Sequence, residues 1–212
     1  METISDAYEN ARLAPIRRSW NPMVWLIAWA YRITIGRVAA PVPVLFARAP
    51  RIIFGHLMLM SASEYGLSLD KRLRHLTRVF GSRVNVCMFC DDLETHMALK
   101  AKTMTREDID ALAQYATSPR FTERERAALR YVEEINTTRS ATDETFEALK
   151  LHFSEKEIVE LTWLNAVGNY LNLMAKPLGI GSEGFCSIPP RVETTPTGES
   201  AQTCDPAQAR QP

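Results

Sequence analysis

Signals for helix starts recur along the middle of this chain and constrain its fold more than any other feature. The segments 105–108 and 122–125 each begin with a threonine and carry an acidic residue three positions later, the pattern of a capping box. Asp143 and Ser154 are further N-cap candidates ahead of apolar positions with helical spacing. Sustained alternation of apolar and polar residues, which would indicate strands, does not occur in the sequence. The sequence therefore predicts an all-α fold.

The predicted helical domain covers 41–182 and is flanked by two regions of different composition. Residues 1–40 form an N-terminal extension that contains three of the four tryptophans. Trp25 and Trp29 share one face of a predicted helix, which we expect to pack on the domain or on a second subunit. Residues 183–212 contain five of the twelve prolines. We predict that this tail is disordered, because it cannot bury enough apolar surface to offset its ordering entropy.

Charge and hydropathy exclude several classes of protein. The 25 basic and 25 acidic residues balance, which argues against a nucleic-acid-binding protein. The apolar run 23–31 has nine residues before Arg32, whereas a bilayer span needs about 20, so we expect no transmembrane segment. Residues 1–19 are polar and mixed in charge, so we also expect no signal peptide. Four cysteines are too few for a secreted disulfide scaffold, and this favours a reducing, cytoplasmic location.

The strongest local feature is the pair Cys87 and Cys90, three residues apart at the start of a predicted helix. At this spacing both thiols lie on one helical face and can form a disulfide with little backbone movement. The positive end of the helix dipole favours thiolate over thiol. A thiolate can attack a peroxide oxygen or a disulfide sulfur, and the second cysteine can then resolve the oxidised first one. The pair therefore predicts thiol-based redox chemistry.

Two ionisable residues are candidates to work with the cysteines. Glu94 lies one helical turn after Cys90 on the same face, and His75 lies twelve residues before Cys87 on the preceding helix. Antiparallel packing of these helices could bring His75 close to Cys90 and Glu94 as a proton relay. We therefore predict that Cys90 attacks and Cys87 resolves, whereas a thioredoxin-like arrangement would make Cys87 the attacking thiol.

Other interpretations of the cysteine pair are weaker. Half of a zinc site would need two more ligands, and the nearby His75 and His96 match the spacing of no standard zinc module. No glycine-rich phosphate loop follows a strand, so the sequence implies no metal and no organic cofactor. Cys186 and Cys204 lie in the predicted tail and are expected to be incidental.

From about Pro43 to Ile180 the chain resembles the carboxymuconolactone decarboxylase family, and within it the alkylhydroperoxidase D-like (AhpD-like) branch. The resemblance is carried by the segments 70–75, 85–90, 104–109, 121–129 and 153–161. It implies an AhpD-like helical bundle that assembles as a homo-oligomer. It also implies that peroxidase members use a glutamate twelve residues before the first cysteine and a histidine four residues after the second. Here His75 and Glu94 occupy those positions, so the two residue types are exchanged.

Together these features predict a thiol-dependent peroxidase or disulfide oxidoreductase with peroxiredoxin-type antioxidant activity. Its partners would be a small hydroperoxide, or a similar oxidant, and a thiol or dithiol reductant. One alternative is decarboxylation of a small lactone acid, which needs a cationic pocket and a general acid or base but no cysteine pair. Another is a non-catalytic helical scaffold, which the aromatic extension would suit.

Overall fold

The structure of the protein is a computed structural model that describes residues 11–186, and every regular element in that range is a helix. The α-helices are α1 (Pro22–Ile35), α2 (Arg51–Glu64), α3 (Lys71–Val84), α4 (Met88–Lys100), α5 (Arg106–Ala111), α6 (Glu123–Thr138), α7 (Asp143–Lys150) and α8 (Glu155–Ala175). Short π and 3₁₀ turns are η2 (Val42–Phe46), η3 (Leu112–Gln114) and η4 (Lys176–Leu178). The predicted all-α fold is confirmed.

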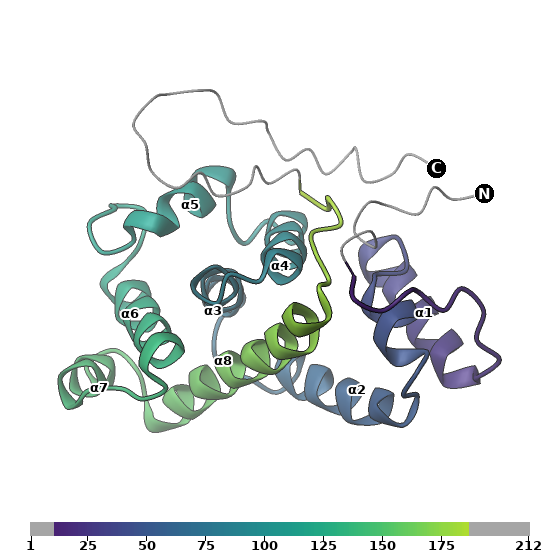
Figure 1. The fold of residues 1–212 in the computed structure, drawn as a ribbon. Coiled ribbons are helices and arrows are strands. Elements are labelled where there is room, and N and C mark those ends of the chain that lie inside the picture. Colours follow the sequence, from purple (N-terminus) through teal and green to yellow (C-terminus); the bar gives the residue numbers. More distant parts are fainter. Residues whose placement is uncertain (1–10, 187–212) are drawn as a thin grey trace.

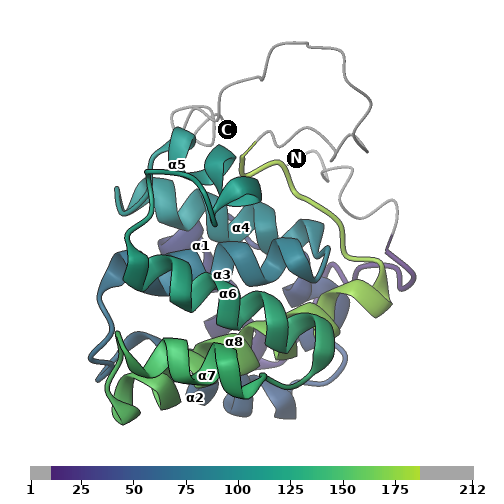
Figure 2. The ribbon, with the colours of Figure 1, turned by 90° about the vertical axis from the view of Figure 1, so that its left-hand side faces the viewer.

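Helix α3 is the centre of the bundle and packs against α4, α6 and α8 (Figure 1). Its apolar stripe is almost completely removed from solvent, with Leu73, Leu76 and Val79 at 0–1% exposure. At roughly 25 cal/mol per Å² of buried apolar surface, such side chains contribute about 1.5–3 kcal/mol each to folding. Seen from the side, α6 and α7 form an outer layer over α3 and α8 (Figure 2). Helices α1 and α2 lie at the opposite end.

Capping boxes hold the starts of α5 and α6, as predicted, and of α8, where Ser154 was predicted only as an N-cap. In each box the side chain of Thr105, Thr122 or Ser154 accepts from a backbone N–H three residues on, and the acidic side chain there accepts from the cap's own N–H. Helix α7 is capped by Thr142 rather than by the predicted Asp143, which becomes the first helical residue. Both positions suit a polar residue, so the sequence alone does not separate them.

Helices α3 and α5 end in different ways. Helix α3 continues past Phe80 to Val84 through Gly81, where a Cβ atom would lie 3.2 Å from the Asn165 side chain. Gly81 therefore permits close approach of α8 and does not loosen the chain. The helix that begins at Arg106 ends at Ala111 and continues as the 3₁₀ turn η3.

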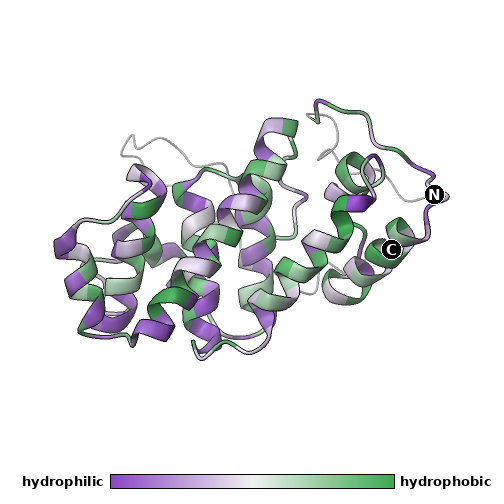
Figure 3. Cartoon of the chain, turned by 90° about the horizontal axis from the view of Figure 1, so that it is seen from below, coloured by the Kyte–Doolittle hydropathy of each residue, from purple (hydrophilic) through white to green (hydrophobic). Residues whose placement is uncertain are grey.

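Helix α1 packs by one face and leaves its aromatic face open. Val24 and Ile27 are buried, whereas Trp25 and Trp29 are 70% and 61% exposed. Figure 3 shows hydrophobic residues concentrated on the N-terminal helices and hydrophilic residues on the helices at the opposite end. The tryptophan face therefore does not pack on its own domain. Among the described helices, none is long and apolar enough to cross a bilayer.

The chain after α8 packs against α4 at least as far as residue 186. The completely buried Asp92 carboxylate accepts from Ser182 Oγ at 2.6 Å and from the backbone N–H groups of Glu183, Phe185 and Cys186 at 2.6–3.0 Å. The predicted tail starts at 183, so its first four residues are part of the packed structure. Residues 187–212, including Cys204, lie outside the described residues.

Candidate active site

The cysteine pair lies in the tight turn between α3 and α4. Cys87 is the N-cap of α4, and its backbone N–H donates to Ser82 O at 2.9 Å. Val86, just before it, has a backbone φ of +52°, a left-handed conformation that a β-branched residue rarely adopts. Cys87 and Cys90 form a disulfide, with Cα atoms 5.3 Å apart. The predicted arrangement of two thiols on the first turn of a helix is therefore present.

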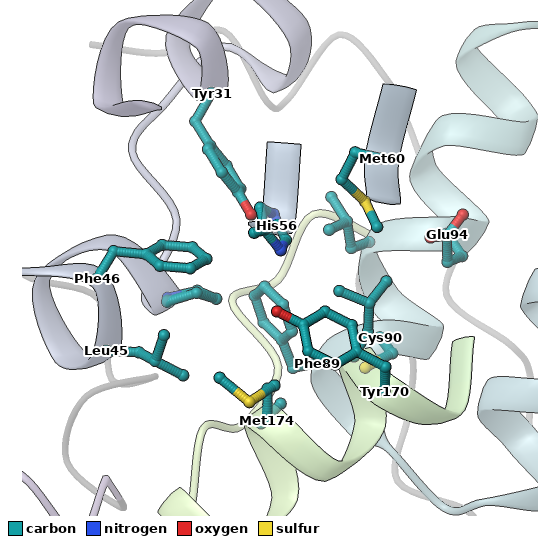
Figure 4. A pocket seen from close by; sticks show the side chains of 14 residues that line it. Tyr31, Leu45, Phe46, His56, Met60, Phe89, Cys90, Glu94, Tyr170 and Met174 are labelled. Carbon is teal, nitrogen blue, oxygen red and sulfur yellow. The ribbon is translucent and has the colours of Figure 1, made fainter. Parts of the chain in front are cut away.

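Cys90 lines a small, mostly apolar cavity of about 100 Å³, which we call the Cys90 cavity (Figure 4). Its polar or aromatic lining comprises Tyr31, Phe46, His56, Phe89, Glu94 and Tyr170. These side chains come from α1, η2, α2, α4 and α8, so the walls are assembled from distant parts of the chain. Tyr31 belongs to the predicted N-terminal extension, which therefore completes the cavity.

His56 is the only histidine in the lining described for this cavity. Its ring lies 4.7 Å from the Phe46 ring and 6.2 Å from the Tyr170 ring, measured between centroids. Its Nδ1 atom is buried and makes no hydrogen bond within the described part of the chain. Burial lowers the pKa of His56 to about 4, so the imidazole is neutral at pH 7. A neutral imidazole with an unused nitrogen can accept a proton.

Glu94 lies one turn after Cys90 on α4 and also lines the cavity. Burial raises the pKa of Glu94, and the Arg78 guanidinium acts in the opposite direction. Burial also raises the pKa of Tyr31, to which the nearby Glu183, Tyr170 and Glu94 contribute. The cavity therefore favours neutral forms of its acids, and a neutral carboxylic acid can donate a proton.

His75 does not line the Cys90 cavity. Its Nδ1 lies 2.5 Å from Thr103 Oγ1, beyond the C-terminal end of α4, whereas Cys90 is in the first turn of that helix. At 1.5 Å per residue, the stretch from Cys90 to Lys100 spans about 15 Å. Because α3 and α4 run antiparallel from a short turn, a residue twelve positions before Cys87 meets the far end of α4. The structure therefore brings together Cys87, Cys90 and Glu94 without His75.

Cys87 opens onto a different and larger space, which we call the Cys87 cleft. It has a volume of about 710 Å³ and lies on the side of α5, η3 and α6. Its charged lining consists of Arg83, Asp91, Arg106, Asp110 and Glu133. The two cysteines of one disulfide therefore line spaces of different size and polarity, although both are buried, at 1% exposure for Cys87 and 5% for Cys90.

Sequence reasoning missed His56, Tyr31 and Tyr170. His56 lies within the predicted helical run after Pro41, but its distance of 31 residues from Cys87 matches no motif. The one usable signal was a histidine among apolar residues at 52–60, which is also what a buried core histidine looks like. No group of three or more potential metal ligands occurs among residues 11–186.

Comparison with known proteins places the chain in a family. The family model described as "Carboxymuconolactone decarboxylase family" matches residues 56–134. The uncharacterized protein YnjA of Escherichia coli (strain K12) is 30% identical over 164 residues, which are 76% of this chain and 89% of that protein. The chain belongs to the carboxymuconolactone decarboxylase family. The segment that the family model matches begins at His56 and includes both cysteines of the pair and Glu94.

Solved structures of similar proteins share the AhpD-like fold with this family member. A protein of unknown function from Agrobacterium tumefaciens, described as a candidate antioxidant defence protein AhpD, is 27% identical with a TM-score of 0.59, over 63% of this chain and 91% of that one. A peroxidase-related protein with an alkylhydroperoxidase AhpD core from Ralstonia eutropha JMP134 is 19% identical with a TM-score of 0.70, over 82% and 93%. The debrominase Bmp8 is 20% identical with a TM-score of 0.72, over 81% and 91%. The last two likenesses concern the fold alone.

Proposed function

We propose that this protein is a thiol peroxidase, in which Cys90 reduces a small hydroperoxide and Cys87 closes the disulfide. The observation that carries the proposal is that Cys90, Glu94 and His56 line one small apolar cavity. A thiolate needs a proton acceptor to form, and the alkoxide that leaves a hydroperoxide needs a proton donor. His56 is neutral at pH 7, so one of its ring nitrogens is free to accept a proton, and burial raises the pKa of Glu94, which favours its protonated form.

The proposed reaction has two steps. His56 accepts the proton of the Cys90 thiol, and the thiolate attacks the outer oxygen of the hydroperoxide. The O–O bond breaks, the alkoxide leaves with a proton from Glu94, and Cys90 becomes a sulfenic acid. The Cys87 thiolate then attacks the Cys90 sulfur and displaces hydroxide, which takes up a proton and leaves as water. Two thiols are oxidised to the disulfide, and the hydroperoxide is reduced by two electrons to an alcohol and water.

The role of His75 in this relay stays a prediction. His75 lies beside Thr103 and outside the cavity lining, which supports His56 as the proton acceptor instead. Assembly as a homo-oligomer and a cytoplasmic location also stay predictions. The exposed tryptophans of α1 support assembly, because a second subunit could cover them. Light scattering on the purified protein tests it.

Decarboxylation of a small lactone acid is less well supported at this cavity. No lysine or arginine contributes to the described lining of the Cys90 cavity, so a substrate carboxylate would be desolvated there without a cationic partner. A purely structural role explains neither the unpaired Nδ1 of His56 nor the disulfide beside it.

The test is a single-turnover reaction of the reduced protein with one equivalent of tert-butyl hydroperoxide. Free thiols at Cys87 and Cys90 are read by alkylation and peptide mass, with Cys87→Ser and Cys90→Ser in parallel. We expect rapid loss of both thiols in the unchanged protein and a trapped sulfenic acid in Cys87→Ser only. Thiols that react no faster than free cysteine would remove the peroxidase function. A sulfenic acid trapped only in Cys90→Ser would exchange the roles of the cysteines.

A further inference from the structure

The disulfide must be reduced after each turnover. The position and charge of the Cys87 cleft indicate which kind of reductant could reach it. A thiolate that attacks a disulfide approaches one sulfur along the S–S axis, from the side opposite to the leaving sulfur. Attack on Cys87 therefore comes from the side away from Cys90. Cys87 lines the cleft, and Cys90 lines only the smaller cavity. The cleft, at about 710 Å³, has the size of a small-molecule site.

Arg106 has guanidinium N–H donors in this cleft that make no hydrogen bond to the described residues. Its Nη1 and Nε atoms are buried and make no hydrogen bond within residues 11–186. Nε lies 3.3 Å from Asp110 Oδ1 as an ion pair, and Nη1 has no such partner. Buried guanidinium donors are normally satisfied, and a carboxylate matches their geometry best. The other guanidinium of the cleft, Arg83, is already held by Asp91 and by the carbonyl of Ile109.

Acidic side chains of the same cleft could hold the opposite charge. The Asp110 carboxylate is 56% exposed, and Glu133 accepts from the Tyr115 hydroxyl at 2.5 Å. A ligand with both a carboxylate and an ammonium group would find partners for both here. The apolar Cys90 cavity has no lysine or arginine in its described lining to pair with the carboxylate of a thiol.

We propose that the Cys87 cleft binds a carboxylate-bearing, low-molecular-weight thiol that reduces the disulfide through Cys87, with Arg106 holding the carboxylate. The proposal rests on the proposed function and names its reductant. The thiolate attacks the Cys87 sulfur, the Cys87–Cys90 bond breaks, and the Cys90 thiolate leaves. A second thiolate attacks the sulfur of the bound thiol and releases Cys87 as a thiolate. Two thiols become one small disulfide, and the protein regains its dithiol.

The test follows the reductive half-reaction alone. The full chain is oxidised with diamide, freed of reagent and reduced with excess 3-mercaptopropionate, which carries a carboxylate, or with neutral 2-mercaptoethanol. Arg106→Gln should slow reduction by 3-mercaptopropionate about tenfold, the effect of one lost charge-assisted hydrogen bond, and change reduction by 2-mercaptoethanol less than about twofold. Arg130→Gln is the matched control, because Arg130 pairs with Glu144 on the surface outside the cleft. Equal effects on the two thiols, or none on either, would overturn the proposal.

A second measurement identifies the attacked sulfur. Cys90→Ser and Cys87→Ser are treated with the symmetrical disulfide of 3-mercaptopropionate, and the mixed disulfide is read by intact mass. We expect faster addition at Cys87, and faster addition at Cys90 contradicts the proposal. Neither measurement uses a peroxide. If the protein does not reduce hydroperoxide but Arg106→Gln still slows reduction by 3-mercaptopropionate, the proposed peroxidase function is wrong and the thiol-binding site is supported. Reduction by thioredoxin alone would exclude the small thiol.

Discussion

The Cys90 cavity and the Cys87 cleft are each lined by one cysteine of the same disulfide but differ in size, in polarity and in the chain segments that form them. The cavity holds about 100 Å³ among aromatic and apolar side chains from both ends of the chain. The cleft holds about 710 Å³ among arginines and carboxylates of α3 to α6. One disulfide therefore joins two environments, because Cys87 lines the cleft and Cys90 lines the cavity. The comparison indicates that an oxidant and a reductant need not share one entrance.

The largest expected effect tests which histidine serves the Cys90 cavity. His56→Gln should slow oxidation of the reduced protein by tert-butyl hydroperoxide about 100-fold, because it removes the proton acceptor for Cys90. His75→Gln is the matched control and should change the rate less than about twofold. Stopped-flow thiol oxidation at pH 7 measures both. The reverse ranking of the two variants would restore the relay predicted from the sequence.

A smaller effect is expected when the proton donor is removed. Glu94→Gln should slow reduction of tert-butyl hydroperoxide about tenfold, because its alkoxide leaving group needs a proton. Peracetic acid releases acetate, a much weaker base, so its rate should change less than about twofold. Competition kinetics with the two oxidants measure the difference. Equal losses with both would show that Glu94 acts on the thiol or on packing.

The size of the Cys90 cavity should govern the choice of hydroperoxide. Met60 lines the cavity, and Met60→Ala should raise the rate with cumene hydroperoxide relative to hydrogen peroxide about fivefold, because it widens a space of about 100 Å³. Met58→Ala, on the exposed face of the same helix, is the control and should leave the ratio unchanged. An unchanged ratio in Met60→Ala would mean that the oxidant reaches Cys90 from elsewhere.

The smallest effect concerns the chain segment 182–186, which packs against α4 through Asp92 and contributes Ser182 to the Cys87 cleft. Burial raises the pKa of Glu183 to about 7, against the backbone N–H of Ala40 and the charge of Arg37, and the nearby Asp92 adds to the rise. The docked segment therefore binds a proton more tightly than the released one, whose carboxyl has a pKa near 4.5. Docking is strongest below about pH 4.5 and weakens as the pH rises to about 7.

Hydrogen exchange of the Phe185 amide, corrected for intrinsic pH dependence, measures this docking. Between pH 5 and pH 8 protection should fall at least about threefold, but by less than the full pKa shift allows, because the opening that exposes the Phe185 amide moves Glu183 only partly into water. Glu183→Gln stays neutral and should show the same protection at both pH values. A rise in protection with pH would contradict the direction.

The helices were largely predictable because their signals are local. A capping box or a stripe of apolar residues lies within one or two turns, so Thr105, Thr122 and Ser154 mark helix starts in any fold. The cysteine pair and Glu94 lie within two turns of one helix and were predictable for the same reason. The end of α3 was less predictable. A glycine is favoured at position 81 because Asn165, on a helix far along the chain, lies too close for a larger side chain.

The sequence by itself determined an all-α fold and two thiols at the start of a helix. Only the tertiary structure decided which histidine lines the same cavity as Cys90, because the turn between α3 and α4 places His75 at the far end of α4 and the packing of α2 brings in His56. It also decided that Cys87 and Cys90 open onto different spaces. Helical spacing fixes the direction of each side chain, but the neighbours on each side come from segments dozens of residues away.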